Sequence, residues 1–194
     1  MCHDSMTTLE KKNLISKMTL SLSHRGPDFQ DVWLSNNSNI ALGHSRLSIQ
    51  DLTENGNQPM FSNNKRYLIS FNGEIYNHFE LRKNKLNGFE NLNWRGNSDT
   101  ETLLECLVNW GIEKTLSLLE GMFSFAFVDI FNNTLYLGRD SFGEKPLYWG
   151  WIDKTIVFCS ELKALNNHPL FIKRLSPEAV SQYFQIGYIP NPLS

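Results

Sequence analysis

Cys2, the second residue of the chain, has the chemistry of a nucleophile. It follows Met1, and a methionine ahead of a small residue is commonly removed, which would leave Cys2 with a free α-amine. A thiol beside its own amine combines a nucleophile and a base in one residue. A lone cysteine is more often a small buried hydrophobe, so the interpretation of Cys2 depends on the rest of the chain.

Asn72 and Gly73 follow an apolar segment that is expected to be a strand. An asparagine side chain and the next backbone N–H can point at one position, which is what an oxyanion hole requires. The alternative is a plain Asn-Gly turn, and the dipeptide alone favours that alternative.

Two charged residues could bind the ends of an amino acid. Arg46 lies in a mostly apolar stretch, where its guanidinium either reaches solvent or holds a carboxylate through two hydrogen bonds. Asp99 lies in the first turn of an expected helix, where it either complements the helix dipole or binds an ammonium group. The segment from His24 to Asp28 is more simply a surface turn.

Capping signals predict the helices that must position these residues. They are Thr7 with Glu10, Ser98 with Glu101, and Ser176 before Pro177. The first helix should end near residue 23 and the second at Gly111. A short helix is also expected to begin at Glu161.

Strands are expected over 32–34, 40–42, 67–71, 122–129, 134–138 and 156–159. The period of the apolar residues changes from 3.6 to 2 at Met122. Period 2 places Phe123, Phe125 and Phe127 on one face of a buried strand and Ser124, Ala126 and Val128 on the other. Because helices and strands come in clusters, the sequence predicts an α+β fold with antiparallel sheets covered by helices.

Composition excludes several classes of function. The chain has 194 residues and a net charge of −2, which gives no electrostatic basis for binding nucleic acid or an anionic membrane. Three distant cysteines, Cys2, Cys106 and Cys159, indicate a reducing compartment, so a cytoplasmic location is expected. We find no metal-ligand spacing, no apolar run of about 18 residues and no signal peptide.

Eight short segments occur in a fixed order: 24–28, 46–51, 72–77, 98–101, 121–126, 138–140, 145–148 and 160–165. Together they resemble the glutaminase domain of asparagine synthetases. That domain is a class II glutamine amidotransferase of the N-terminal-nucleophile hydrolase type. Pro27-Asp28 and the string from Asn72 to Asn77 resemble this branch more than the glutamate synthase or sugar-phosphate branches.

The resemblance implies a catalytic role for three residues. Cys2 would be the nucleophile, with its own α-amine as the base. Asn72 and Gly73 would form the oxyanion hole. The reaction would be hydrolysis of the L-glutamine side-chain amide to glutamate and ammonia, through a γ-glutamyl thioester, for asparagine synthesis.

The resemblance also implies a glutamine-binding site. Arg46 would hold the α-carboxylate, and Glu74 and Asp99 would bind the α-ammonium side. The pocket would be lined by the backbone of Leu47, Ser48, Ile49 and Gln50. No cofactor is expected in this chain, since ATP and Mg²⁺ would belong to a synthetase domain.

The implied fold is a four-layer αββα sandwich of two antiparallel sheets. Residues 1–168 would form the amidotransferase domain of type 2, and residues 169–194 a linker and the start of an absent synthetase domain. The sequence has no Ser-Gly-Gly-x-Asp-Ser loop for ATP. The expected partners are glutamine and a synthetase domain normally in the same chain, with a homodimer left open. Residues 186–194 should be poorly anchored.

The sequence departs from the family directly after Cys2. The family has an apolar strand there, whereas this chain has His3, Asp4, Ser5 and Met6, which make a poor buried strand. We therefore expect that the first strand is missing or replaced and that glutaminase activity is weak or lost. Two alternatives remain: a non-catalytic relic of the fold, or an amidotransferase for a sugar carboxylate in surface-polysaccharide assembly.

Overall fold

The structure is a computed structural model, which describes residues 6–37, 39–86, 92–191 and 193. The predictions about Cys2 and about residues 3–5 lie outside the described residues. The helices are α1 (Thr8–Leu20), α2 (His78–Glu80), α3 (Asp99–Trp110), α4 (Ile112–Leu118) and α5 (Pro177–Ile186). Single turns of 3-10 helix occur at Ser23–Arg25 and Glu54–Gly56, a longer one at Leu162–Asn167, and a π-helical turn at Leu81–Lys85.

Eight strands form three antiparallel sheets in the described part of the chain. The strands are β1 (Phe29–Leu34), β2 (Ala41–Arg46), β3 (Met60–Phe61), β4 (Tyr67–Ile75), β5 (Gly121–Asp129), β6 (Thr134–Arg139), β7 (Tyr148–Ile152) and β8 (Thr155–Cys159). The central sheet has the order β3-β4-β5-β6, and β1-β2 and β7-β8 are separate hairpins. The predicted α+β class with antiparallel sheets is confirmed.

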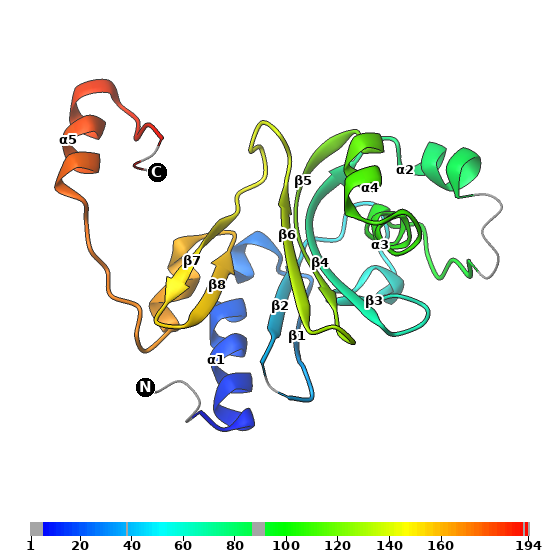
Figure 1. Cartoon of the computed structure of the whole chain (residues 1–194), viewed down its shortest axis with the longest axis horizontal. Helices are drawn as coiled ribbons and strands as arrows, with labels where there is room; N and C mark the ends of the chain where they lie inside the picture. The colour runs from blue at the N-terminus through cyan, green and yellow to red at the C-terminus, as the bar shows by residue number, and fades with distance from the viewer. Residues whose placement is uncertain (1–5, 38, 87–91, 192, 194) are drawn as a thin grey trace.

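The elements are arranged in layers around the central sheet (Figure 1). Helix α3 packs on one face of this sheet against β4, and the two hairpins pack on the other face. Helix α1 covers the hairpin β1-β2 on the side away from the central sheet and also contacts the turn at Leu162–Asn167. The hairpins therefore lie between α1 and the central sheet.

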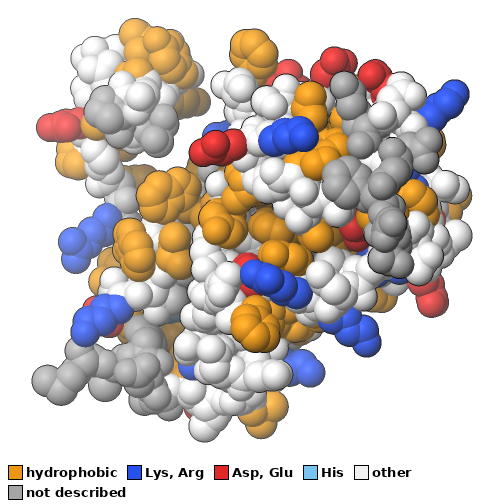
Figure 2. Space-filling view, turned by 45° about the vertical axis from the view of Figure 1, so that its right-hand side comes forward, with side chains coloured by type: hydrophobic (Ala, Val, Ile, Leu, Met, Phe, Trp, Pro, Cys, Tyr) orange, Lys and Arg blue, Asp and Glu red, His pale blue; other side chains and the backbone are white. Residues whose placement is uncertain are grey.

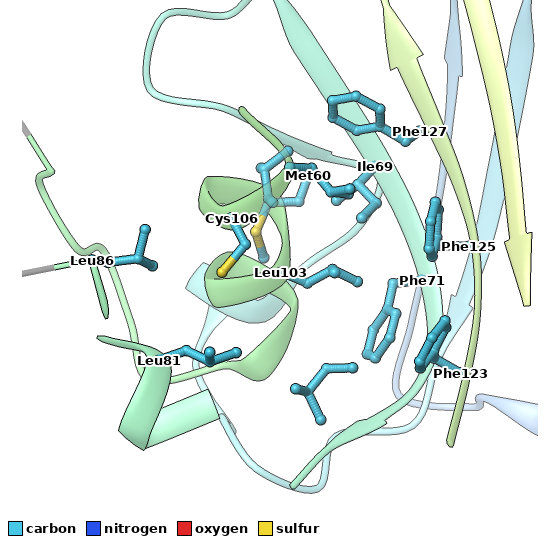
Figure 3. Packing of buried hydrophobic residues seen from close by; sticks show 13 residues of the cluster. Met60, Ile69, Phe71, Leu81, Leu86, Leu103, Cys106, Phe123, Phe125 and Phe127 are labelled. Atoms are coloured by element: carbon cyan, nitrogen blue, oxygen red, sulfur yellow. The ribbon is translucent and has the colours of Figure 1, made fainter. Parts of the chain in front are cut away.

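Strand β5 alternates as its sequence predicts. Phe123, Phe125 and Phe127 all belong to the apolar cluster beneath α3, where Figure 3 shows them beside Ile69 and other core side chains. Ala126 and Val128 belong to the second cluster, on the side of the hairpins, with Leu42 and Leu68. The predicted division of β5 into two faces is confirmed.

The capping residues also act as predicted. Thr7 and Glu10 form both halves of the capping box of α1. The Ser98 hydroxyl accepts the Glu101 N–H at the start of α3, and α3 ends before Gly111, which has a φ of 77°. The Glu101 carboxylate differs from the prediction, because it accepts N–H groups of Arg95 instead of reaching back to the cap.

Other boundaries differ because they depend on tertiary pairing. Helix α1 ends at Leu20, about three residues early, and residues 162–167 form a 3-10 helix. Strand β4 continues four residues beyond the predicted end, through Ile75, because β5 pairs with it over its whole length. Strand β7 was not predicted, and it is held by its pairing with β8.

Helix α5 stands apart from the rest of the molecule in Figure 1. Ser176 caps it and Pro177 is at its first position, as predicted. Its aromatic side chains Tyr183 and Phe184 are exposed, and the lobe at the upper left of Figure 2 carries hydrophobic side chains on its surface. The weak anchoring expected for residues 186–194 stays a prediction.

We expect Ile69→Val to lower the free energy of unfolding by about 0.5–1.5 kcal/mol. Ile69 is completely buried between β4 and α3, so the lost methylene leaves a void. The matched control is Ile172→Val, because Ile172 is 66% exposed. Chemical denaturation of both variants checks this, and equal effects would contradict the described packing.

Candidate active site

The edge of β4 that faces away from β5 is the centre of the candidate site. The Phe71 N–H donates to Gln58 Oε1 at 2.7 Å, and the Ile75 N–H donates to Asp99 Oδ2 at 2.9 Å. Successive backbone N–H groups of a strand point to opposite edges, so the Gly73 N–H points to the same edge, between these two. Asn72 and Gly73 thus lie within a strand, and the interpretation as a plain turn is wrong.

The Asn72 side chain projects from the face of β4 that meets the hairpins. Leu68 and Ser70, at the same period-2 positions, face this side as well. The Asn72 Nδ2 atom is buried and has no hydrogen-bond acceptor among the described residues. A buried amide donor without an acceptor is available to donate to an oxygen atom from outside the described residues, such as that of a ligand.

Arg46 ends β2, and only 7% of its surface is exposed. Its Nη1 donates to the Thr53 carbonyl at 2.8 Å and to Asn57 Oδ1 at 2.7 Å, and its Nη2 donates to the Asp51 carbonyl. Two roles were predicted for Arg46, and the first of them, in which the guanidinium reaches solvent, is wrong. Arg46 holds the loop of residues 51–57, a contact that the sequence did not indicate.

This loop connects Arg46 to the start of α3. Asp51 Oδ2 accepts the Asn97 N–H at 2.9 Å, just before the cap of α3. Gln58 Nε2 donates to Thr100 Oγ1 at 3.3 Å, while its Oε1 holds β4. Arg46, the open edge of β4 and the first turn of α3 are thus joined by one set of hydrogen bonds.

Asp99 is a buried carboxyl at the first position of α3, with 6% of its surface exposed. Burial raises the pKa of Asp99 to about 6, and the hydrogen bond from the Ile75 N–H offsets part of this rise. The negative charge of Glu74 raises the pKa further. Asp99 is therefore ionised at neutral pH and titrates in the mildly acidic range.

Residues 47–50 form a loop between Arg46 and Asp51, and the side chains of Leu47 and Ile49 are 54% and 62% exposed. The Ser48 N–H donates to Asp28 Oδ2 at 2.7 Å, so the turn before β1 fixes the start of this loop. Gly26 packs directly on the backbone of β2, where a Cβ atom would overlap the Ser45 carbonyl. Residues 24–28 thus form the predicted surface turn, and Gly26 and Asp28 hold it against the end of β2.

A large cavity of about 1080 Å³ lies between the hairpins, beneath α1. Asn72 lines this cavity, whereas Arg46, Gly73, Glu74 and Asp99 do not. The predicted site residues therefore divide into a group at the open edge of β4 and one amide that faces the cavity.

Two residues of this region were missed in the sequence. Gln58 binds both β4 and α3, and His44 Nε2 lies 3.1 Å from the Phe71 carbonyl oxygen. A lone glutamine has no pattern that would have revealed it. His44 could have been found from the alternation of β2, because Leu42, His44 and Arg46 share the face toward the central sheet.

The two cysteines that the structure describes are buried. Burial raises the pKa of Cys106 to about 12 and that of Cys159 to about 11, so both thiols stay protonated at neutral pH. Over the described ranges, we find no cluster of histidine, cysteine or carboxylate side chains that could hold a metal ion. None of the described helices is long and apolar enough to cross a membrane.

Comparison with known proteins identifies the family. The model of the glutamine amidotransferase domain matches residues 2–194. The chain belongs to this family. It is 37% identical to the glutamine-hydrolysing asparagine synthetase 1 of Bacillus subtilis, over 98% of this chain and 29% of that protein. It is 38% identical to the glutamine-hydrolysing asparagine synthetase of Zea mays, over 82% of this chain and 26% of that protein.

The amidotransferase domain described here is thus homologous to part of the asparagine synthetases. It spans less than a third of the length of these two relatives. The alternative of an amidotransferase for a sugar carboxylate has no better support.

Proposed function

We propose that this domain binds L-glutamine at the open edge of β4 and hydrolyses its side-chain amide to glutamate and ammonia. The observation that supports the proposal is the set of hydrogen bonds that links Arg46, through the loop of residues 51–57, to the first turn of α3 and to this edge. Asp99 supplies an anion and Arg46 a cation. The Gly73 N–H supplies a donor that points to the same edge as the hydrogen-bonded N–H groups of Phe71 and Ile75. An α-amino acid with an amide needs these three kinds of group.

Each end of the substrate has a binding partner in this proposal. The Arg46 guanidinium has five N–H groups and gives three bonds to the loop, so Nε and one hydrogen of Nη2 remain for the α-carboxylate. Asp99 and Glu74 bind the α-ammonium side. The backbone of Leu47, Ser48, Ile49 and Gln50 lines the pocket, which agrees with the exposure of this loop.

Asn72 and Gly73 would stabilise the oxyanion. The tetrahedral intermediate places a negative oxygen where the amide carbonyl oxygen was, and preorganised donors lower its energy. Asn72 Nδ2 is such a donor, since it is buried without an acceptor in the described part of the chain. Cys2 would attack the amide carbon, and its α-amine would take the thiol proton.

The proposed fold is the four-layer αββα sandwich of N-terminal-nucleophile hydrolases, and the order of helix, hairpins, central sheet and helix supports it. In this proposal the first strand of the sandwich is missing, because residues 3–6 are mostly polar. Residues 1–168 form the amidotransferase domain, and residues 169–194 lead into a synthetase domain. That domain would use ATP, Mg²⁺ and the released ammonia to make asparagine.

Release of ammonia from glutamine tests the catalytic part of the proposal. A nucleophile displaced by about 1 Å can lose on the order of 100-fold in rate, and residues 3–6 have little apolar surface to fix Cys2. We therefore expect a rate below about 1 s⁻¹ for the chain without Met1. We expect Cys2→Ala to remove it.

Cys159→Ala is the matched control, because the Cys159 thiol is buried and protonated at neutral pH. We expect it to keep the wild-type rate. Ammonia release that persists in Cys2→Ala would contradict the assigned nucleophile. A Cys2-dependent rate of about 1 s⁻¹ or more would show that residues 3–6 position the thiol well, against the missing-strand proposal.

A further inference from the structure

Strand β3 is too short to pair with β4 at the candidate site. It begins at Met60, which lies opposite Ile69, and it has two residues. In the same register, a β3 that began earlier in the chain would lie opposite Phe71 and Gly73. The preceding chain instead forms the 3-10 turn Glu54–Gly56. Strand β3 therefore ends its pairing with β4 before Phe71 and Gly73.

Two side chains take the place of β3 beside Phe71. Gln58 Oε1 accepts the Phe71 N–H at 2.7 Å, and His44 Nε2 lies 3.1 Å from the Phe71 carbonyl oxygen. A carbonyl oxygen only accepts, so the His44 ring carries a proton on Nε2 and donates it. Burial lowers the pKa of His44 to about 4, so the ring is neutral at pH 7. In a wider sheet, the backbone of a neighbouring strand would make both of these bonds.

Phe71 is thus held at three points directly before Asn72 and Gly73. Its ring packs in the apolar cluster beneath α3, as Figure 3 shows. Its N–H and its carbonyl belong to two successive peptide units, which are planar, so Gln58 fixes one plane and His44 fixes the next. The second of these units includes the nitrogen of Asn72. A rotation of this unit would therefore turn both proposed oxyanion donors.

The same two side chains join Phe71 to the elements that carry the charged groups of the site. His44 lies on β2, two residues before Arg46. Gln58 Nε2 donates to Thr100 Oγ1 at 3.3 Å, next to Asp99 in the first turn of α3. The distance from the proposed oxyanion hole to each charged group is thus bridged by one hydrogen-bonded side chain.

We propose that His44 and Gln58 are positioning residues for the oxyanion hole. They hold both backbone groups of Phe71 in place of a neighbouring strand, and they thereby fix the direction of Asn72 and Gly73. This role rests on the proposed function, because it concerns hydrolysis of glutamine at the same edge. Neither side chain needs to touch the substrate.

Loss of either side chain should slow turnover more than it weakens binding. The negative oxygen exists only in the transition state and the intermediate, so misdirected donors raise the barrier and leave the bound substrate unaffected. A displacement of about 1 Å in a catalytic group can lower a rate on the order of 100-fold. The effect is therefore expected in kcat and not in KM.

A pair of amide variants at position 44 tests this role. Glutamine is long enough to place an amide nitrogen where His44 Nε2 lies, whereas asparagine is one methylene shorter and otherwise the same. We expect His44→Asn to lower kcat for glutamine hydrolysis by about tenfold or more and to leave KM unchanged. His44→Gln should restore kcat. Equal kcat values for the two variants would overturn the proposal.

A second pair approaches Phe71 from its N–H side. Gln58→Met keeps the size of the side chain and removes the hydrogen bonds to Phe71 and Thr100, so kcat should fall by about tenfold or more. Gln30→Met makes the same change on β1, where Gln30 donates to Ser45 Oγ at 3.2 Å, and should leave kcat unchanged. Equal kcat values for these two variants would also overturn the proposal. If a variant does not fold, as circular dichroism shows, the other pair decides.

The Gly73 amide gives a readout that does not depend on the rate of the unchanged chain. With isotope-labelled protein, saturating L-glutamine should shift this amide less in His44→Asn than in His44→Gln, although both variants bind glutamine. Binding with the same Gly73 shift in both variants would overturn the role of His44 alone. No binding of glutamine to the unchanged protein would instead overturn the proposed function, and the role of His44 and Gln58 with it.

Discussion

Replacement of Arg46 by lysine should weaken glutamine binding by about 30- to 100-fold, although the charge is kept. A lysine ammonium is a point charge, whereas the guanidinium holds a carboxylate through two parallel bonds. Loss of one partner of a buried, hydrogen-bonded charge pair at a binding site costs on the order of 2–5 kcal/mol, and a kept charge recovers part of this. Calorimetric titration of the variant with L-glutamine measures the change.

The loop of residues 51–57 amplifies the effect of this substitution. Arg46 donates three hydrogen bonds to that loop, and lysine cannot reproduce their planar arrangement. The matched control is Arg66→Lys, because Arg66 pairs with Asp129 at the far end of β4. Equal affinity of the Arg46 variant and the unchanged protein would remove Arg46 from the site.

Replacement of Asp99 by asparagine should also weaken glutamine binding strongly, by about 30-fold or more at pH 7.5. The α-ammonium group of glutamine would then lose a buried negative partner. In the unchanged protein, affinity should be constant above about pH 7 and should fall roughly tenfold per pH unit below the pKa of Asp99, about 6. Glutamine itself keeps its zwitterionic form from pH 5 to 7, so the change comes from the protein.

The pH profile separates Asp99 from a general loss of structure. We expect Asp99→Asn to bind weakly and with the same affinity from pH 5 to 7.5. Asp31→Asn is the control, because Asp31 is exposed on β1, and it should keep both the affinity and the pH dependence. A retained pH dependence in Asp99→Asn would assign the titration to another group.

The raised pKa of Asp99 also makes the stability of the fold depend on pH. The pKa of Asp99 is raised on folding, so the native state holds a proton between about pH 4 and 6 that the unfolded chain has released. The contribution of this group to stability is therefore full below about pH 4 and is lost as the pH rises to about 6. Buried Asp99 thus favours binding of a cation at neutral pH at some cost in stability.

Local signals in the sequence predicted much of the fold. Thr7, Ser98 and Ser176 start helices because a cap depends on residues only three positions away. The two faces of β5 follow from period 2 alone. The last four residues of β4 could not be predicted, since Glu74 and Ile75 are in a strand only because β5 lies beside them.

The site was predicted in its residue types more than in its contacts. Asp99 was expected in the first turn of a helix, and it lies there, but its hydrogen bond to Ile75 joins residues 24 positions apart. Arg46 was expected to bind a carboxylate or reach solvent, and in the structure it holds a loop. Such contacts depend on the folded arrangement of distant segments, which no local pattern encodes.

The central claim is that glutamine binds at the open edge of β4, and a titration followed by amide NMR tests it most directly. With isotope-labelled protein at pH 7.5, addition of L-glutamine should shift the Gly73 amide strongly, together with those of Ser48 and Asp99. The Trp149 and Tyr183 amides, which lie on β7 and α5, should not move. The account would be contradicted if the Gly73 amide did not shift at saturating glutamine, or if the shifts were confined to β7, β8 and α5.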